Sequence, residues 1–380
     1  MTRSTIAAFL LAGLASVAAC ACTSAPPQDP VAAAPAVPAA HFWFAAYPDF
    51  MVEFDPVTDT VVKKIQLQNG MSWGVTLLFD RQHFAVITDT QRKVEIVDCK
   101  QGAVASVHDF SEEGVIVRVR SISELPGGTQ WYVETDRVKK LVDRYEFQPA
   151  QTLLYDVGER KIVRKMRRMP QILSRGARIS PDGLSWHVFD RDGNLQIVDP
   201  KTLKETGKID LATPQFAGQG RISLRRTDLL FGRDPNKYRM LCSYSDPVQH
   251  SRSSWGYVDI DLQQKKITDM VEWGQGPSGF GSYLSRDAKL TVSSNGGWGG
   301  GSDRKTTIQL YDLENGKKLR EFQTEFRPRQ SLAAIAPDGS KVYVGGAGSD
   351  FQVFDAVTFQ LLRVVEFDGE IQGQVYMLDV

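Results

Sequence analysis

The chain is poor in the residues that metal, haem and disulfide sites require. Its 380 residues include four cysteines and five histidines, and the histidines show neither the HxH nor the HExxH spacing of zinc sites. The sequence has no CxxCH haem signature, no GxSxG nucleophile elbow and no GK[ST] phosphate loop. These absences argue against the common motif-bearing enzymes, so we expect no catalytic residues, no metal and no cofactor.

The sequence also lacks an excess of either charge and a hydrophobic run of membrane-spanning length. Lys+Arg and Asp+Glu each number 45, and the pI is about 7.0. Balanced charge provides no global field for nucleic acid, and we expect no nucleic-acid partner. The apolar run Ile6–Ala19 has the length of a signal-peptide core and is too short for a comfortable membrane span.

The N-terminus resembles the signal peptide of a bacterial lipoprotein. Arg3 provides a positive start, and the apolar run ends in Val17-Ala18-Ala19-Cys20, which resembles a lipobox. Small side chains there let a peptidase reach the bond before Cys20, whose thiol would carry the lipid. We therefore expect residues 1–19 to be removed and Cys20 to be the attachment site. The alternative is a plain secretory signal that is cut elsewhere.

Residues 20–40 are rich in Ala and Pro and almost free of charge. Such a segment cannot bury a core and predicts a semi-extended tether. The residue after Cys20 is Ala21 rather than Asp, which by resemblance to known bacterial sorting favours the outer membrane. We expect a membrane-anchored lipoprotein of the cell envelope, facing the periplasm or the cell surface.

From residue 41 the chain repeats one local pattern. A short alternating apolar strand ends in Asp, a polar turn follows, and a second strand begins. The signature aspartates lie 43 to 62 residues apart, a spacing typical of propeller blades with insertions. They are Asp55, Asp98, Asp156, Asp199, Asp261, Asp312 and Asp355.

Each repeat expands into four strands, except at the two ends of residues 41–380. The first unit has no inner strand before HFWFAAY, and the last unit is followed by one extra strand, QGQVYMLD. That strand has the pattern needed to complete the first unit, which would remove an open edge. We therefore predict an all-β fold: a seven-bladed β-propeller with four-stranded antiparallel blades, closed by pairing of the C-terminal strand with the N-terminal blade.

These repeats resemble those of the YVTN and WD-repeat-like propeller superfamily, over nearly all of the mature chain. The YVTN tetrapeptide is approximated by VYVG at Val342–Gly345, and the WD dipeptide with its His partner is missing. The superfamily includes lactonases, heavy chains of amine dehydrogenases and non-catalytic scaffolds. The resemblance therefore implies the fold and leaves several functions open.

In propellers, ligands bind where loops converge over the central channel, and these loops here are rich in Gly, Gln, Arg and aromatic residues. Aromatic residues there supply apolar contact, and arginines can clamp carboxylates or phosphates. The alternative is that such residues serve turns and contacts between blades. The predicted binding residues are Trp73, Arg175, Arg221, Trp273, Phe280, Trp298, Arg327 and Arg329.

Four further features call for an expectation. The insertion Thr135–Ala150 reads as a loop that is solvated, caps the channel or meets a partner, with a helix over Val138–Tyr145 as a rival. The basic run Arg160–Arg168 fits an outer strand, where charge prevents edge pairing.

We expect no disulfide between Cys99 and Cys242, which fall in repeats that are not neighbours. Acidic loop residues could bind Ca²⁺ as in lactonases or form a solvated rim; they are Asp109, Glu112, Glu113, Asp368 and Glu370.

The sequence thus favours a lipid-anchored, non-catalytic propeller that binds a protein, peptide or glycan partner of the cell envelope. A rigid ring with variable loops is a common way to build a recognition surface. The alternative is an enzyme or enzyme subunit, either a lactonase-like hydrolase or a subunit resembling the heavy chain of amine dehydrogenases.

Overall fold

The computed structural model divides the chain into two units, Met1–Val37 and Pro38–Val380. It describes residues 39–380 apart from 126, 168–177, 181–183, 190–193, 215–216, 218, 221, 232–236, 247, 249–252, 276–279, 286–288, 296–306, 325–329 and 347. The expected signal peptide, the tether up to residue 38 and Cys20 lie outside these residues. No helix within the described residues is long and apolar enough to cross a membrane.

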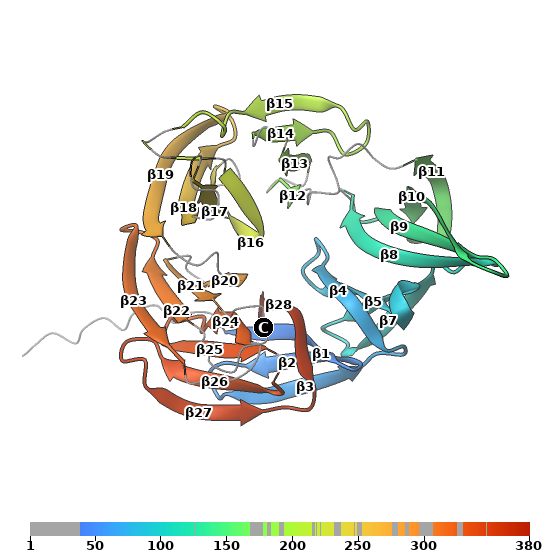
Figure 1. Ribbon diagram of the computed structural model, residues 1–380. Helices are drawn as coiled ribbons and strands as arrows, with labels where there is room; N and C mark the ends of the chain where they lie inside the picture. Colours follow the sequence, from blue (N-terminus) through green and yellow to red (C-terminus); the bar gives the residue numbers. More distant parts are fainter. Residues whose placement is uncertain are drawn as a thin grey trace, which may run out of the picture. The chain divides into compact units, whose positions relative to one another are not determined.

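Six blades of the second unit each consist of four consecutive antiparallel strands (Figure 1). The first of these blades contains β4 (Met71–Leu77), β5 (His83–Thr88), β6 (Lys93–Asp98) and β7 (Ala103–Asp109). The second contains β8 (Val115–Glu124), β9 (Gln130–Lys140), β10 (Tyr145–Asp156) and β11 (Lys161–Arg167). The third contains β12 (Arg178–Ile179), β13 (Trp186–Phe189), β14 (Leu195–Val198) and β15 (Glu205–Ile209). One short 3₁₀ helix, η1 (Asp89–Gln91), joins β5 to β6.

The other three of these blades follow the same order of strands. The fourth contains β16 (Ile222–Phe231), β17 (Lys237–Ser245), β18 (Ser253–Asp261) and β19 (Lys266–Gln275). The fifth contains β20 (Phe280–Leu284), β21 (Leu290–Asn295), β22 (Thr307–Asp312) and β23 (Lys317–Gln323). The sixth contains β24 (Gln330–Ile335), β25 (Lys341–Gly346), β26 (Asp350–Asp355) and β27 (Leu361–Glu366). Period-2 alternation and turn residues account for these strands.

The remaining sheet combines the two ends of this unit. Its order is β28-β1-β2-β3, with β1 (Ala40–Tyr47), β2 (Phe50–Asp55), β3 (Thr60–Gln66) and β28 (Glu370–Asp379). The C-terminal strand β28 runs antiparallel to β1, and Trp43 lies opposite Tyr376. Among the described residues, the segment before β4 supplies three strands of this sheet, and the fourth comes from the other end of the sequence.

The prediction of seven blades that form a closed sheet is wrong in its blade count and in its closure. Six blades, and not seven, consist of four consecutive strands. The predicted pairing of the C-terminal strand with the N-terminal unit is confirmed by β28 and β1 in the sheet that contains Asp55. Moreover, no strand pair joins one sheet to the next among the described residues, so there is no closed sheet. Side chains packed between the separate sheets hold the propeller together, and the pairing of β28 with β1 completes one of these sheets.

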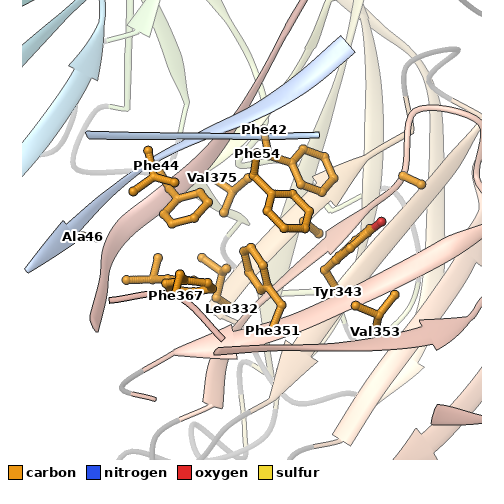
Figure 2. Close-up of a cluster of buried hydrophobic side chains, with 14 residues drawn as sticks. Phe42, Phe44, Ala46, Phe54, Leu332, Tyr343, Phe351, Val353, Phe367 and Val375 are labelled. Atoms are coloured by element: carbon orange, nitrogen blue, oxygen red, sulfur yellow. The ribbon is translucent and has the colours of Figure 1, made fainter. Parts of the chain in front are cut away.

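Apolar clusters lie between neighbouring sheets. One of them joins the composite sheet to the blade β24–β27 through Phe42, Phe54, Tyr343 and Phe351, whose rings point toward one another in Figure 2. The ring centroids of Phe42 and Tyr343 are 5.1 Å apart in an edge-to-face arrangement, which adds to the gain from burial. Corresponding clusters join the other neighbouring sheets, so each blade buries its faces against its neighbours.

The seven signature aspartates end strands and open turns, as predicted. In each case a carboxylate oxygen accepts a backbone N–H two or three residues further along. In Asp355, for example, Oδ1 accepts from the N–H groups of Val357 and Thr358 at 2.9 and 2.7 Å. These hydrogen bonds hold the pKa of Asp355 below its usual value, although partial desolvation opposes them. The repeat signature is therefore a turn motif.

Candidate functional site: the arm and the groove at its base

The blade β8–β11 carries an extension that the other blades do not share in the described residues. Its strands β9 and β10 have 11 and 12 residues. The register of β9 shifts once against each neighbouring strand, and both shifts lie near Thr135. The shift against β8 falls between Val119 and Ser121, and the shift against β10 falls between Gln148 and Gln151. Such bulges bend and re-aim a sheet. We call residues 115–119 and 135–148, beyond these bulges, the arm.

The outer edge of the arm has no partner strand among the described residues. The strand β11 pairs with β10 only from Gln151 onward, so Tyr145–Gln148 pairs on one side alone, with β9. Figure 1 shows the hairpin of β9 and β10 projecting outward from its sheet. An edge of this kind offers backbone donors and acceptors to another chain.

One face of the arm is apolar and exposed to solvent. Ile116, Val138 and Phe147 lie directly opposite one another on β8, β9 and β10, so their side chains share a face. Phe147 is 83% exposed and Ile116 38% exposed. Tyr145, two residues before Phe147 and therefore on the same face, is 59% exposed. A protein rarely leaves two neighbouring aromatic side chains in water without a use.

The tip of the arm adds a further apolar side chain. Strands β9 and β10 are joined by Leu141–Arg144, closed by a hydrogen bond from the Leu141 N–H to the Arg144 carbonyl at 2.8 Å. Val142 in this turn is fully exposed. Charged residues surround it, and Arg144 pairs with the adjacent Asp143 at 3.0 Å. The tip therefore resembles an interface with an apolar centre and a polar rim.

The segment Thr135–Ala150 forms neither the predicted loop nor, over Val138–Tyr145, the alternative helix. The segment forms the end of β9, a short turn and the start of β10. Its local sequence mixes apolar and charged residues without strict alternation. The strand conformation is fixed instead by pairing with β8, which lies about twenty residues earlier in the chain.

A groove of about 370 Å³ lies at the base of the arm, on the face opposite to Phe147. It crosses all four strands of the blade β8–β11 and is walled by the connection between β7 and β8. Its volume lies at the lower end of the range for small-molecule sites. The lining residues are Asp109, Phe110, Ser111, Glu112, Val117, Arg137, Leu153, Ile162 and Lys165.

The main polar feature of the groove is a two-point ion pair between Arg137 and Glu112. Arg137 Nη1 and Nη2 each lie 2.6 Å from a Glu112 carboxylate oxygen. Arg137 is only 8% exposed, and its Nε has no partner among the described atoms, whereas the Glu112 side chain is well exposed. Hydrogen bonds from Arg137 lower the pKa of Glu112, and the charge of nearby Lys165 adds to this effect.

The three predicted site residues that the structure describes belong neither to the arm nor to the lining of the groove. Trp73 and Phe280 lie within β4 and at the start of β20. Trp273, on β19, packs between two blades: its ring stacks on Tyr311 with centroids 4.2 Å apart and contacts Trp255. Five predicted residues lie outside the described part of the chain: Arg175, Arg221, Trp298, Arg327 and Arg329.

The predicted acidic loop residues separate into two places. Asp109 Oδ1 accepts the Ser111 N–H at 2.8 Å, and Glu112 pairs with Arg137. Asp368 pairs instead with Lys64 at 2.6 Å, and Glu370 begins β28. Among the residues that the structure describes, no group of three His, Cys, Asp or Glu side chains could hold a metal ion.

Two further sequence expectations can be checked in the described residues. Cys99 and Cys242 form no disulfide, as predicted. Residues Lys161–Arg167 of the basic run form β11, the outermost strand of its blade, also as predicted. Arg137 and Lys165 lie 25 and 53 positions after Glu112 in the chain, so no local sequence signal marks them as site residues.

Comparisons with known proteins show the fold alone. No family model matches the chain. No curated protein matches it either. Among solved structures it is similar to dihydro-heme d1 dehydrogenase NirN in complex with DHE, at 12% identity over 92% of this chain and 77% of that chain, with a TM-score of 0.55.

Two other solved structures show a similar level of likeness. A functionally unknown protein from Desulfotomaculum acetoxidans is 13% identical over 89% of this chain and 98% of that one, with a TM-score of 0.52. The complex of KlAtg21 with the coiled-coil of AgAtg16 is 13% identical over 79% and 85%, with a TM-score of 0.51. A β-propeller fold thus occurs in proteins named for an enzyme activity and in proteins named for a complex.

Proposed function

We propose that the protein is a lipid-anchored, non-catalytic β-propeller of the cell envelope that binds a protein partner through the arm. The observation that carries this proposal is the exposed apolar row of Ile116, Val138 and Phe147, continued by Tyr145. Aromatic side chains are frequent anchors of protein interfaces because they bury a large area at little entropic cost.

The geometry of the arm supports a protein rather than a small ligand. Its apolar residues lie on an open face of a three-stranded sheet, whereas small molecules favour concave sites. The edge of Tyr145–Gln148, which has no partner strand among the described residues, would let a partner strand add to the sheet, so that backbone hydrogen bonds supplement the side-chain contacts. The partner would cover Phe147 and Tyr145 and leave the charged residues of the tip at the rim.

The lipid anchor is part of the same proposal. With Cys20 acylated and the Ala/Pro-rich residues before β1 as a tether, the propeller would stand off a membrane with its arm free to meet a partner. We expect Cys20→Ser to move the protein from the membrane fraction to the soluble fraction of the envelope. If the Cys20→Ser protein stays with the membrane to the same extent as the wild type, the lipid attachment is wrong.

The experiment for the arm compares three forms of the protein purified from the cells that produce it. They are the wild type, Phe147→Ser, and the control Phe79→Ser, which changes an exposed Phe in the turn between β4 and β5. We expect one protein to copurify in near-stoichiometric amount with the wild type and with Phe79→Ser, and to be lost from Phe147→Ser. Equal copurification with all three forms would contradict the proposed role of the arm.

The predicted loop residues remain part of the proposal as a second contact region. Trp298 lies between glycines in Asn295–Asp303, and an exposed Trp is a common interface anchor. We expect Trp298→Ala to weaken capture of the same partner. Unchanged capture by Trp298→Ala would remove this loop from the interface and leave the arm as the only contact proposed.

A further inference from the structure

The groove at the base of the arm is chemically unlike the apolar face. It places a buried guanidinium, that of Arg137, beside an exposed ammonium, that of Lys165, above a floor of apolar side chains. Arg137 is held in place by its position on β9 between β8 and β10. A planar, fixed guanidinium is the group that proteins most often use to bind carboxylates at two points.

Within the molecule, the Glu112 carboxylate occupies this guanidinium. Its two oxygens each accept a hydrogen bond from Arg137 at 2.6 Å, which is the arrangement a free carboxylate would adopt. Glu112 belongs to the short connection between β7 and β8 and is well exposed. It can therefore swing into water at little cost in burial, whereas Arg137 cannot leave the sheet.

We propose that the groove binds a ligand that joins a carboxylate to an apolar chain, and that the ligand carboxylate replaces Glu112 on Arg137. Lys165 supplies a second positive charge: its ammonium forms no ion pair among the described residues and lies near enough to Glu112 to act on it electrostatically. The apolar chain of the ligand lies on Phe110, Val117, Leu153 and Ile162.

The chemistry fits two sources of ligand, a free aliphatic acid and the C-terminus of a peptide that ends in an apolar residue. Both offer a monocarboxylate next to an apolar group, and the groove volume of about 370 Å³ suits a chain of modest length. The two sources can be told apart with sodium octanoate and N-acetyl-alanyl-leucine as probes. The matching amides, octanamide and N-acetyl-alanyl-leucinamide, which lack the carboxylate, are the controls.

The test measures binding of these probes by calorimetry to the full-length protein with Cys20→Ser, which keeps the lipid from competing. We expect at least one acid to bind saturably and its amide to bind at least about tenfold more weakly, because a charge-assisted pair is lost. We expect Lys165→Gln to weaken acid binding about five- to tenfold. The matched control is Lys161→Gln, on the same strand but paired with Glu159, and it should leave affinity unchanged.

The decisive variant is Glu112→Gln. Because Glu112 competes with the ligand for Arg137, its removal should tighten acid binding by about tenfold, whereas a merely structural Glu112 would leave affinity equal or lower. The proposal is overturned if neither acid binds to the wild type or to Glu112→Gln, if the amide binds as well as the acid, or if Glu112→Gln weakens binding. Tighter binding of octanoate or of the dipeptide identifies the source.

Discussion

Phe147 on β10 lies directly opposite Val138 on β9, and the exposed Phe147 shares one face of the arm with the half-buried Val138. In a blade of a propeller, such a pair would ordinarily be covered by the next blade. Here the strands run past the bulges near Thr135 and leave the blade interface. This pair is therefore a property of the extension, and its removal should cost the fold little.

We expect Phe147→Ser to change the free energy of unfolding by no more than about 0.5 kcal/mol, because the side chain makes few contacts that folding creates. Denaturant unfolding of the purified protein measures this change. A loss above about 2 kcal/mol would mean that Phe147 supports the fold, and a loss of partner capture could then no longer be assigned to the arm surface.

The interface between the composite sheet and the blade β24–β27 should depend on a buried hydroxyl. The Tyr343 hydroxyl lies 2.6 Å from Asp59 Oδ1 and 2.7 Å from the Pro56 carbonyl oxygen, and Lys341 Nζ also donates to Asp59 at 2.7 Å. We expect Tyr343→Phe to destabilise the protein by about 1–3 kcal/mol, because the buried Asp59 loses a donor.

The control for Tyr343→Phe is Tyr47→Phe, which changes an exposed tyrosine of β1. Both variants keep the aromatic ring, so the comparison isolates the hydroxyl group. Thermal unfolding of the two variants beside the wild type gives the answer. Equal melting temperatures for all three would show that the Asp59 contacts contribute nothing to the joining of these sheets.

Stability should fall in mild acid because of His108. Burial lowers the pKa of His108 from 6.5 to about 4, and the charge of Arg160 contributes. The folded protein therefore keeps His108 neutral where the unfolded chain is protonated. The stability that neutral His108 provides is fully present above pH 6.5 and declines as the pH falls toward about 4, by up to about 3 kcal/mol.

The measurement for His108 is the free energy of unfolding between pH 7 and 4 for the wild type and for His108→Gln. A glutamine can still hydrogen-bond the Tyr155 hydroxyl, which lies 3.0 Å from His108 Nδ1, but it does not titrate. We expect a shallower loss of stability on acidification in the variant. Parallel curves would contradict the assignment of this pH dependence to His108.

Because each signature aspartate accepts a backbone hydrogen bond in its turn, replacing one should lower the free energy of unfolding by a modest amount. Asp261 Oδ1 accepts the Gln264 N–H at 2.8 Å, and Asp261 is buried. We expect Asp261→Ala to cost about 1 kcal/mol and Asp261→Asn, which keeps an acceptor, to cost less than half of that. Chemical denaturation would detect the difference, and equal costs for the two variants would show that the hydrogen bond is not the cause.

Local patterns were sufficient to predict the repeated parts of the fold. The strand that ends in Asp, the polar turn and the outer strand each have a signal of a few residues, and the turns at Asp55 and Asp355 follow it directly. The same count of signatures overstated the regularity of the ring. The missing inner strand before HFWFAAY and the extra strand QGQVYMLD also predicted the composite sheet, which the pairing of β28 with β1 confirms. No local signal shows that neighbouring sheets share no strand pairs among the described residues.

The candidate site was less accessible to sequence reasoning because it is assembled from distant segments. Arg137 meets Glu112 only through the pairing of β9 with β8, and Lys165 arrives on the outermost strand of the same blade. The sequence singled out Trp273 as an aromatic near a glycine-rich loop. The structure places it against Tyr311 between two blades, and no local signal separates these two environments.

The most direct test of the arm as a binding surface places a photo-crosslinking amino acid at position 147 in living cells, with position 79 as the control. The account predicts one dominant crosslinked protein from position 147, absent from position 79 and abolished when Val142→Ser and Tyr145→Ser are added. It would be contradicted if position 147 gave no crosslink above background, or the same set of crosslinks as position 79.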